Sequence, residues 1–238
     1  MQDTRQSRSD EAFADEKLYR DQRAVYRNST GPDAREVLWQ ELAGRSPGRL
    51  LDVGCGEGEL AERAARTGWE VVATDRSARM VELSAARGLR ASRQDARRLG
   101  VADASVDCVV GAWVLHYLDQ DEVHLAVAEM HRVLRPGGLL VLATQSERHM
   151  AELWDRLPTV SYRIPFPAER ADPVLAGLFG GVRRTDVEGT VVFEDWDQAR
   201  TFLARQLRPA SLADQLERFA APLPVTRRSA VITAERPA

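Results

Sequence analysis

Short apolar runs alternate with amphipathic stretches through the middle of the chain. A short apolar run bounded by Gly, Pro or Asp predicts a buried strand, whereas apolar residues at helical spacing predict a helix. The expected strands are residues 49–53, 70–75, 89–94, 106–112 and 139–144. The expected helices between them are residues 59–67, 77–87 and 121–134, the last stopped by Pro136-Gly137-Gly138. Alternating strands and helices predict a parallel sheet covered by helices on both faces.

The two ends of the chain differ from this middle part. Residues 1–10 are polar, and we expect them to be a disordered tail before a single domain at 11–238. Helical spacing over 11–28 and 33–42 predicts N-terminal helices within residues 11–44. After the fifth strand, prolines interrupt the helical pieces of residues 145–180. The remaining expected elements are strands at 182–193 and 225–233, with helical stretches at 195–207 and 211–220 between them.

Composition narrows the classes of function. The chain has 33 basic and 36 acidic residues, and its net charge of −3 gives no electrostatic reason to expect nucleic acid as a partner. No apolar run is long enough for a membrane span, and the N-terminus lacks the apolar core of a signal peptide. The two cysteines, Cys55 and Cys108, fit no zinc or redox spacing. We therefore expect a cytoplasmic protein without a membrane partner or a metal.

The most informative stretch is Asp52-Val53-Gly54-Cys55-Gly56-Glu57-Gly58, where the first strand opens into a glycine-rich turn. Glycines let the backbone pass close to a ligand, and the following helix offers unpaired N–H groups. The turn lacks the Gly-Lys-Ser/Thr of a P-loop, and its third glycine comes one residue early for a pyrophosphate-binding turn. Its acids would repel a pyrophosphate but suit a cationic ligand that carries an amino group.

A second acid, Asp75, ends the second strand roughly 20 residues after the glycines, where nucleotide-binding folds place a ribose-binding carboxylate. Over about residues 45–145 the chain resembles the class I S-adenosylmethionine-dependent methyltransferases. The resemblance implies a doubly wound, seven-stranded, mostly parallel Rossmann-like sheet with an antiparallel last strand. It also implies that Gly54 and Gly56 carry the amino-acid end of S-adenosylmethionine, that Asp52 orients that end, and that Asp75 holds the ribose hydroxyls.

The same resemblance suggests further cofactor contacts. Asp95 and Ala96 match the turn that recognises adenine, although Asp95 could instead pair with Arg97 or Arg98. Arg76 could stack on the adenine or lie on the surface. The backbone at Gly111 and Ala112 would face the methionine moiety. Tyr19 or Tyr26 would close the cofactor pocket, with core packing as the alternative.

The expected reaction is methyl transfer from S-adenosylmethionine to an O, N or C nucleophile of a small-molecule acceptor, natural products included, with S-adenosylhomocysteine as product. His116 follows the fourth strand and could act as general base or pack against the cofactor. Residues 11–28 and 145–180, the latter as a lid segment, would select the acceptor. The aromatic residues of 145–180 favour a planar acceptor, and the arginines of the same segment favour an acidic one. The sequence leaves the role of His149 open. The aromatic residues are Trp154, Tyr162, Phe166 and Phe179, and the arginines are Arg148, Arg156, Arg163 and Arg170.

Two alternatives remain at this point. An RNA-modifying methyltransferase would need a basic face or an added RNA-binding module, and the sequence shows neither. A protein of this fold could also bind the cofactor without transferring the methyl group. We expect a monomer or a homodimer.

Overall fold

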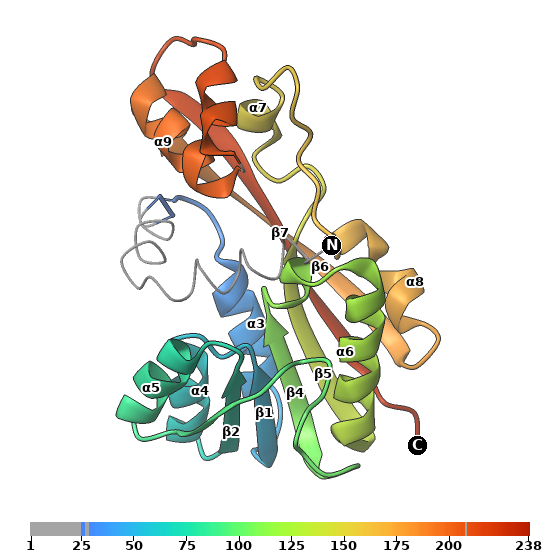
Figure 1. Cartoon of the computed structure of the whole chain (residues 1–238). Helices are drawn as coiled ribbons and strands as arrows, with labels where there is room; N and C mark the ends of the chain where they lie inside the picture. Colours follow the sequence, from blue (N-terminus) through green and yellow to red (C-terminus); the bar gives the residue numbers. More distant parts are fainter. Residues whose placement is uncertain (1–24, 27–28, 208) are drawn as a thin grey trace.

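The computed structural model describes residues 25–26, 29–207 and 209–238 (Figure 1). Tyr19, the tail at 1–10 and most of the expected helix at 11–28 lie outside these residues. The strands form one seven-stranded sheet in the order β3-β2-β1-β4-β5-β7-β6. They are β1 (Arg49–Val53), β2 (Glu70–Asp75), β3 (Arg90–Arg93), β4 (Val106–Ala112), β5 (Leu134–Gln145), β6 (Gly180–Phe193) and β7 (Leu223–Glu235).

The first five strands run parallel, and β7 is antiparallel to both of its neighbours, β5 and β6. This confirms the fold class expected from the sequence. The α-helices are α3 (Ala34–Ala43), α4 (Glu59–Arg66), α5 (Ala78–Ala86), α6 (Gln120–Val133), α7 (Ala151–Trp154), α8 (Ala171–Leu175) and α9 (Trp196–Gln206). Within the described residues, the short 3₁₀ helices are η1 (Leu115–Tyr117), η2 (Ala168–Arg170) and η3 (Ala210–Gln215).

Side-chain caps explain where several helices begin. Ser77 accepts from the backbone N–H of Met80 at the start of α5. Asp119 and Glu122 form a reciprocal capping box at the start of α6. Such caps satisfy N–H groups that have no partner within the helix. These polar residues therefore fix the helix starts at the carboxyl edge of the sheet.

The start of β5 differs from the prediction. A break at Pro136-Gly137-Gly138 was expected before a strand at 139, but the strand already begins at Leu134. The register of β4 with β5 shifts between the pairs Val106–Leu134 and Cys108–Leu139. Gly137 has a φ of 76° within this irregularity and donates its N–H to the carbonyl of Arg236. The proline and glycines therefore form a bulge inside the strand rather than a separate loop.

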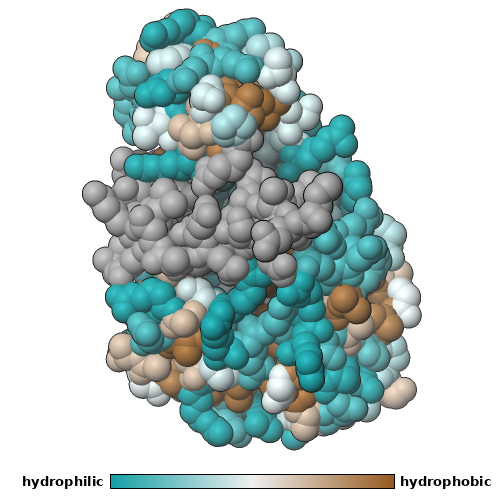
Figure 2. Space-filling view, viewed as in Figure 1, coloured by the Kyte–Doolittle hydropathy of each residue, from teal (hydrophilic) through white to brown (hydrophobic). Residues whose placement is uncertain are grey.

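Each face of the sheet has its own apolar core. Leu50 and Leu51 are neighbours in β1, yet they belong to opposite cores because successive side chains of a strand point to opposite faces. One core contains α6 residues such as Val127 and Met130. The other contains α3 residues such as Leu38. The outer surface on the side shown in Figure 2 is mainly hydrophilic, with hydrophobic residues in small separate groups.

A third core lies beyond the end of the main sheet. β5 pairs with β7 only as far as Gln145–Ser229, whereas β6 and β7 stay paired to Phe193–Leu223. This projecting hairpin carries α7, α9 and η3 (Figure 1). Their buried residues, such as Phe193, Phe202 and Leu153, pack into one cluster. We call residues 146–162 and 194–222, with the projecting hairpin, the cap.

The expected lid at 145–180 is divided between the cap and the sheet. Trp154 and Tyr162 pack in the cap cluster. Phe166 and Phe179 instead belong to the core beneath α6, where the ring of Phe179 meets His131 edge-on at 5.2 Å. Phe166 is 1% exposed. A direct role of Phe166 in acceptor binding, suggested by the sequence, is therefore not supported.

Replacement of Phe166 by Ala should lower the free energy of unfolding by about 3–5 kcal/mol, because it leaves a cavity in the sheet core. Urea unfolding followed by circular dichroism measures this loss. Tyr162→Phe, which removes only a hydroxyl, is the control and should change stability by less than about 1.5 kcal/mol. Unchanged stability of Phe166→Ala would show that Phe166 does not support the core.

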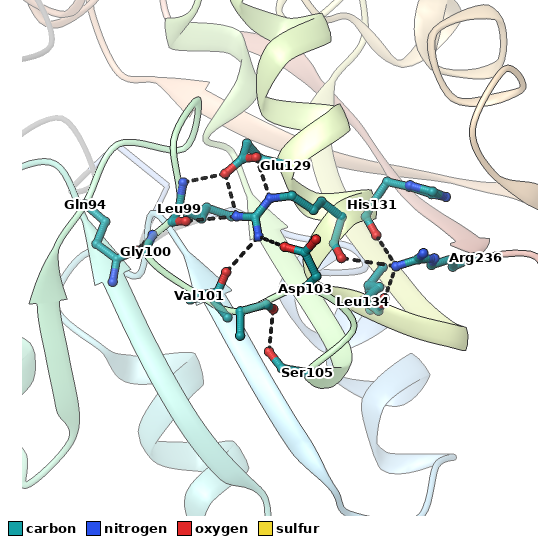
Figure 3. A network of polar contacts seen from close by, with 12 residues as sticks. Gln94, Leu99, Gly100, Val101, Asp103, Ser105, Glu129, His131, Leu134 and Arg236 are labelled. Atoms are coloured by element: carbon teal, nitrogen blue, oxygen red, sulfur yellow. Dashed lines mark hydrogen bonds and ion pairs between the residues drawn. The ribbon is translucent and has the colours of Figure 1, made fainter.

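Arg132 of α6 holds the later part of the loop between β3 and β4. Arg132 pairs with Glu129 and Asp103 and donates to the carbonyl oxygens of Leu99 and Val101 (Figure 3). Glu129 also accepts from the backbone N–H of Leu99. This network fixes the segment that directly follows the predicted adenine turn.

No helix in the described part of the chain is long and apolar enough to cross a membrane.

Candidate cofactor and acceptor site

The glycine turn after β1 needs its glycines for different reasons. Gly54, Gly56 and Gly58 all have positive φ, at 71°, 55° and 80°. A Cβ on Gly54 would lie 2.8 Å from Cγ2 of Val114, beyond β4. A Cβ on Gly58 would clash with Ser84 of α5 and lie 2.8 Å from Leu89. Gly58 therefore allows α4 and α5 to pack closely.

Asp75 joins the glycine turn to the end of β2. Its carboxylate accepts from the backbone N–H of Gly56 at 2.9 Å and from that of Ser77 at 2.8 Å. Burial raises the pKa of Asp75, and these two hydrogen bonds oppose the rise. The backbone N–H of Arg76 also donates to Asp75, and because a carboxylate has about four lone-pair positions, Asp75 keeps capacity for a ribose hydroxyl. Asp75 therefore both shapes the turn and can bind a ribose.

Asp52 is a buried acid next to the glycine turn. The residue is 2% exposed, and its Oδ2 atom has no hydrogen-bond partner among the described residues. Burial, together with the charge of Asp75, raises the pKa of Asp52 to about 7. An ionised carboxylate in such surroundings is unfavourable unless a cation accompanies it. The site is therefore suited to a cationic ligand next to Asp52.

Asp95 pairs with Arg97, which was the alternative left open by the sequence. Arg97 donates to Asp95 from its backbone at 2.9 Å and from Nε at 2.8 Å, and it also contacts Glu122. This guanidinium holds the pKa of Asp95 below its usual value. The charge of Arg76 also lowers the pKa of both Asp75 and Asp95, so Arg76 lies near both acids. Adenine recognition by Asp95, Ala96 and Arg76 stays a prediction.

The end of β4 places His116 at the carboxyl edge of the sheet. Gly111 is required there by packing, because a Cβ would lie 2.9 Å from Leu142. Ala112 is half-buried, and Trp113 adopts a φ of 55° while donating to the carbonyl of Ala143. His116 follows in η1, and its Nδ1 atom is buried without a hydrogen-bond partner among the described residues. Burial and the nearby His149 lower the pKa of His116 to about 4.

His149, which the sequence left open, is the centre of a buried polar cluster. Its Nδ1 lies 2.8 Å from the carbonyl oxygen of Arg228. Its Nε2 lies 3.4 Å from the hydroxyl of Tyr26 and 3.3 Å from Nε2 of Gln145. The hydroxyl of Tyr162 donates to Oε1 of Gln145 at 2.5 Å. Burial lowers the pKa of His149 to about 4 and raises that of Tyr26 to about 12.

A pocket of about 440 Å³ opens beside this cluster in the cap. Its walls include His149, Trp154 and Tyr162. The rings of Trp154 and Tyr162 are stacked, with centroids 4.9 Å apart and planes at 27°. The indole N–H of Trp154 is buried and has no hydrogen-bond partner among the described residues. The pocket wall therefore combines two stacked aromatic rings with the polar side chain of His149.

The comparisons with known proteins agree with this geometry. Residues 51–142 match the family described as a methyltransferase domain. A probable S-adenosylmethionine-dependent methyltransferase of Mycolicibacterium smegmatis is 39% identical over 190 residues, which cover 68% of this chain and 73% of that protein. The chain belongs to the S-adenosylmethionine-dependent methyltransferases.

Two other methyltransferases resemble this chain, one over part of its sequence and one in its fold. A malonyl-[acyl-carrier protein] O-methyltransferase of Enterobacter lignolyticus is 32% identical over 153 residues, or 61% of this chain. The match spans 59% of that relative's length. The crystal structure of the N-methyltransferase NodS from Bradyrhizobium japonicum, in complex with S-adenosyl-L-homocysteine, covers 99% of both chains with a TM-score of 0.64 and 19% identity. At that identity the likeness shows the fold.

The residues of this methyltransferase fit S-adenosylmethionine. The cofactor carries a cationic amino group and a sulfonium, and the buried Asp52 carboxylate lacks a partner at Oδ2. Asp75 offers an acceptor position for a ribose hydroxyl beside the glycine turn. Among the described residues, no group of three or more His, Cys, Asp or Glu could hold a metal ion.

Proposed function

We propose that this chain transfers the methyl group of S-adenosylmethionine to a small-molecule acceptor. The observation that carries the proposal is the buried Asp52 carboxylate, which has a partnerless oxygen beside the glycine turn. In the reaction, a lone pair of the acceptor forms the new bond to the methyl carbon, and the electrons of the broken bond remain on sulfur. The protein's part is to align the two molecules and exclude water.

The cap supports a small molecule as the acceptor. Its pocket lies just after the carboxyl end of β5, and His149 in its wall helps to lower the pKa of His116, which follows β4. Ligands of open α/β sheets bind at the carboxyl edge of the sheet. The wall formed by Trp154 and Tyr162 suits a planar group. Formation of S-adenosylhomocysteine with small acceptors but not with RNA tests this proposal, and the reverse result would contradict it.

The affinity for S-adenosylhomocysteine should depend on Asp75. Asp75→Ala should weaken binding by about 1–3 kcal/mol, because it removes charge-assisted hydrogen bonds to the ribose and the support of the Gly56 N–H. Isothermal titration calorimetry measures the change. The control is Asp121→Asn, at an exposed acid of α6. Full affinity in a folded Asp75→Ala protein would refute the assigned cofactor site.

A further inference from the structure

We propose that His149 accepts the proton of a phenolic hydroxyl on the acceptor, so that this chain methylates aromatic alcohols at oxygen. The inference rests on the methyl transfer proposed above and names its acceptor class.

The hydrogen bonds of His149 show which ring nitrogen is the acceptor. A carbonyl oxygen can only accept, so the 2.8 Å contact with Arg228 requires a hydrogen on Nδ1. Nε2 of the neutral ring then carries a lone pair. The neighbours of Nε2, the Tyr26 hydroxyl and the Gln145 amide, are at 3.4 and 3.3 Å, which is long for hydrogen bonds. A hydroxyl of the acceptor can therefore replace either of them.

Gln145 supports the same orientation of the ring. Its Oε1 accepts from Tyr162, so its Nε2 is the atom that faces His149. An amide nitrogen is a donor, which again leaves the role of acceptor to Nε2 of His149. His149 is only 3% exposed, and the adjacent backbone N–H of Met150 donates to Thr226 at 2.9 Å. The ring is thus held in place by β5 and β7.

His149 also lies where the pocket meets the carboxyl edge of the sheet. It lines the pocket together with Trp154 and Tyr162, and its charge perturbs His116 beyond β4. The stacked rings of Trp154 and Tyr162 form part of the pocket wall. A flat ring with a hydroxyl fits this combination of an aromatic wall and a proton acceptor.

The surrounding charges favour a neutral acceptor. Arg228 pairs with Glu188 and Glu152, and Arg227 donates to the carbonyl of Pro32 and lies 3.8 Å from Asp33. On the pocket rim, the pairs are Arg148 with Asp155 and Glu147 with Arg170. A carboxylate or ammonium group entering here would have to displace one of these partners. A carboxylate also has no proton to give to His149.

With a phenol, the hydroxyl group supplies both the nucleophilic oxygen and the proton. The oxygen lone pair forms the bond to the methyl carbon, the O–H bond breaks, and its proton moves to Nε2 of His149. The electron pair of the sulfur–methyl bond stays on sulfur, and the imidazolium later releases its proton to water. His116 has no comparable partner at Nδ1, which leaves it the packing role that the sequence also allowed.

The test compares two probes, phenol and 4-nitrophenol, in mildly alkaline buffer where 4-nitrophenol is already largely ionised. His149→Asn keeps an amide donor toward Arg228 but removes the proton acceptor. Its kcat with phenol should fall by about 10²-fold or more. Its kcat with 4-nitrophenol should fall less than about tenfold, since that probe has little proton to lose. Equal losses with both probes would overturn the proposal, because a merely structural role affects both alike.

Two further measurements keep the outcome decisive. His124→Asn, at an exposed histidine of α6, is the control and should match the wild type. In ¹⁵N-histidine NMR, phenol added to the protein with S-adenosylhomocysteine should shift the His149 signal, which His149→Asn identifies. The absence of that shift, or methylation of benzoate or benzylamine in preference to phenol, would overturn the phenolic acceptor and leave methyl transfer standing. Failure to bind S-adenosylhomocysteine would instead refute the proposed function.

Discussion

The affinity of the protein for S-adenosylmethionine is expected to fall by up to about tenfold per pH unit below about pH 7. Burial and the charge of Asp75 raise the pKa of Asp52 to about 7. A cationic ligand prefers the ionised carboxylate, so at lower pH its binding must first remove a proton. Above this pKa the group is already ionised and adds no further dependence. Calorimetric titration between about pH 5 and pH 8 measures the slope.

Asp52→Asn isolates this contribution. The variant should bind more weakly at about pH 8 and lose the slope attributed to Asp52, while Asp121→Asn should keep the wild-type profile. Titrations in two buffers with different heats of ionisation should also detect proton release on binding near pH 6 (about one unit below the pKa). The same slope in the wild type and in Asp52→Asn would show that another group is responsible.

The stability of the ligand-free protein should respond to Asp52 in the opposite direction. The native state keeps a proton on Asp52 up to about pH 7, whereas the unfolded state loses it near its ordinary value of 3.8. The stabilising contribution is therefore full below about pH 4 and is lost as the pH rises through about 7. The cofactor should thus raise the melting temperature more at about pH 8 than at about pH 6.

Gly58→Ala is expected to lower the free energy of unfolding by about 3 kcal/mol or more. The backbone at Gly58 has a φ of 80°, which costs an L-residue about 1–2 kcal/mol. Its Cβ would also collide with Ser84 and Leu89, and overpacking adds about 1–3 kcal/mol. Urea unfolding, with the slope checked for two-state behaviour, gives the value.

Gly88→Ala is the matched control for this change. Gly88 has nearly the same φ, 82°, but a Cβ there would have no atom within 4 Å. Its loss should be limited to the backbone term of about 1–2 kcal/mol. Equal losses for the two variants would mean that the contact between the glycine turn and α5 carries no energy of its own.

The main sheet could be predicted well because local pattern and tertiary position agree there. The bounds of β1, β2 and β4 are those expected, since each is a short apolar run that ends at a turn. Prediction failed at β5, where Pro136 and two glycines break the pattern but the strand continues as a bulge. The sequence also gave no sign that residues 194–222 join α7 in a cap, because that contact depends on the length of the β6–β7 hairpin.

The cofactor half of the site was more predictable than the acceptor half. Asp52, Asp75 and the glycines are close in sequence and occupy a known turn, and the structure brings them together. The partners of His149 lie far apart in the chain, at Tyr26, Gln145 and Arg228. Pairing of Asp95 with Arg97 could be anticipated only as one of two options, since both roles use the same carboxylate.

The projecting hairpin leaves residues 194–222 as one continuous segment that the corresponding segment of another protein could replace. Phe193 and Leu223 are paired, so the segment between them leaves the sheet and returns to it at one rung of the ladder. A segment from another methyltransferase could be inserted between these two anchors without stretching β6 or β7. Chimeras of this kind would keep the cofactor turn and the pocket residues of one protein and change only the packing behind Trp154 and Tyr162, which would separate the effect of that packing from the effect of the pocket wall itself.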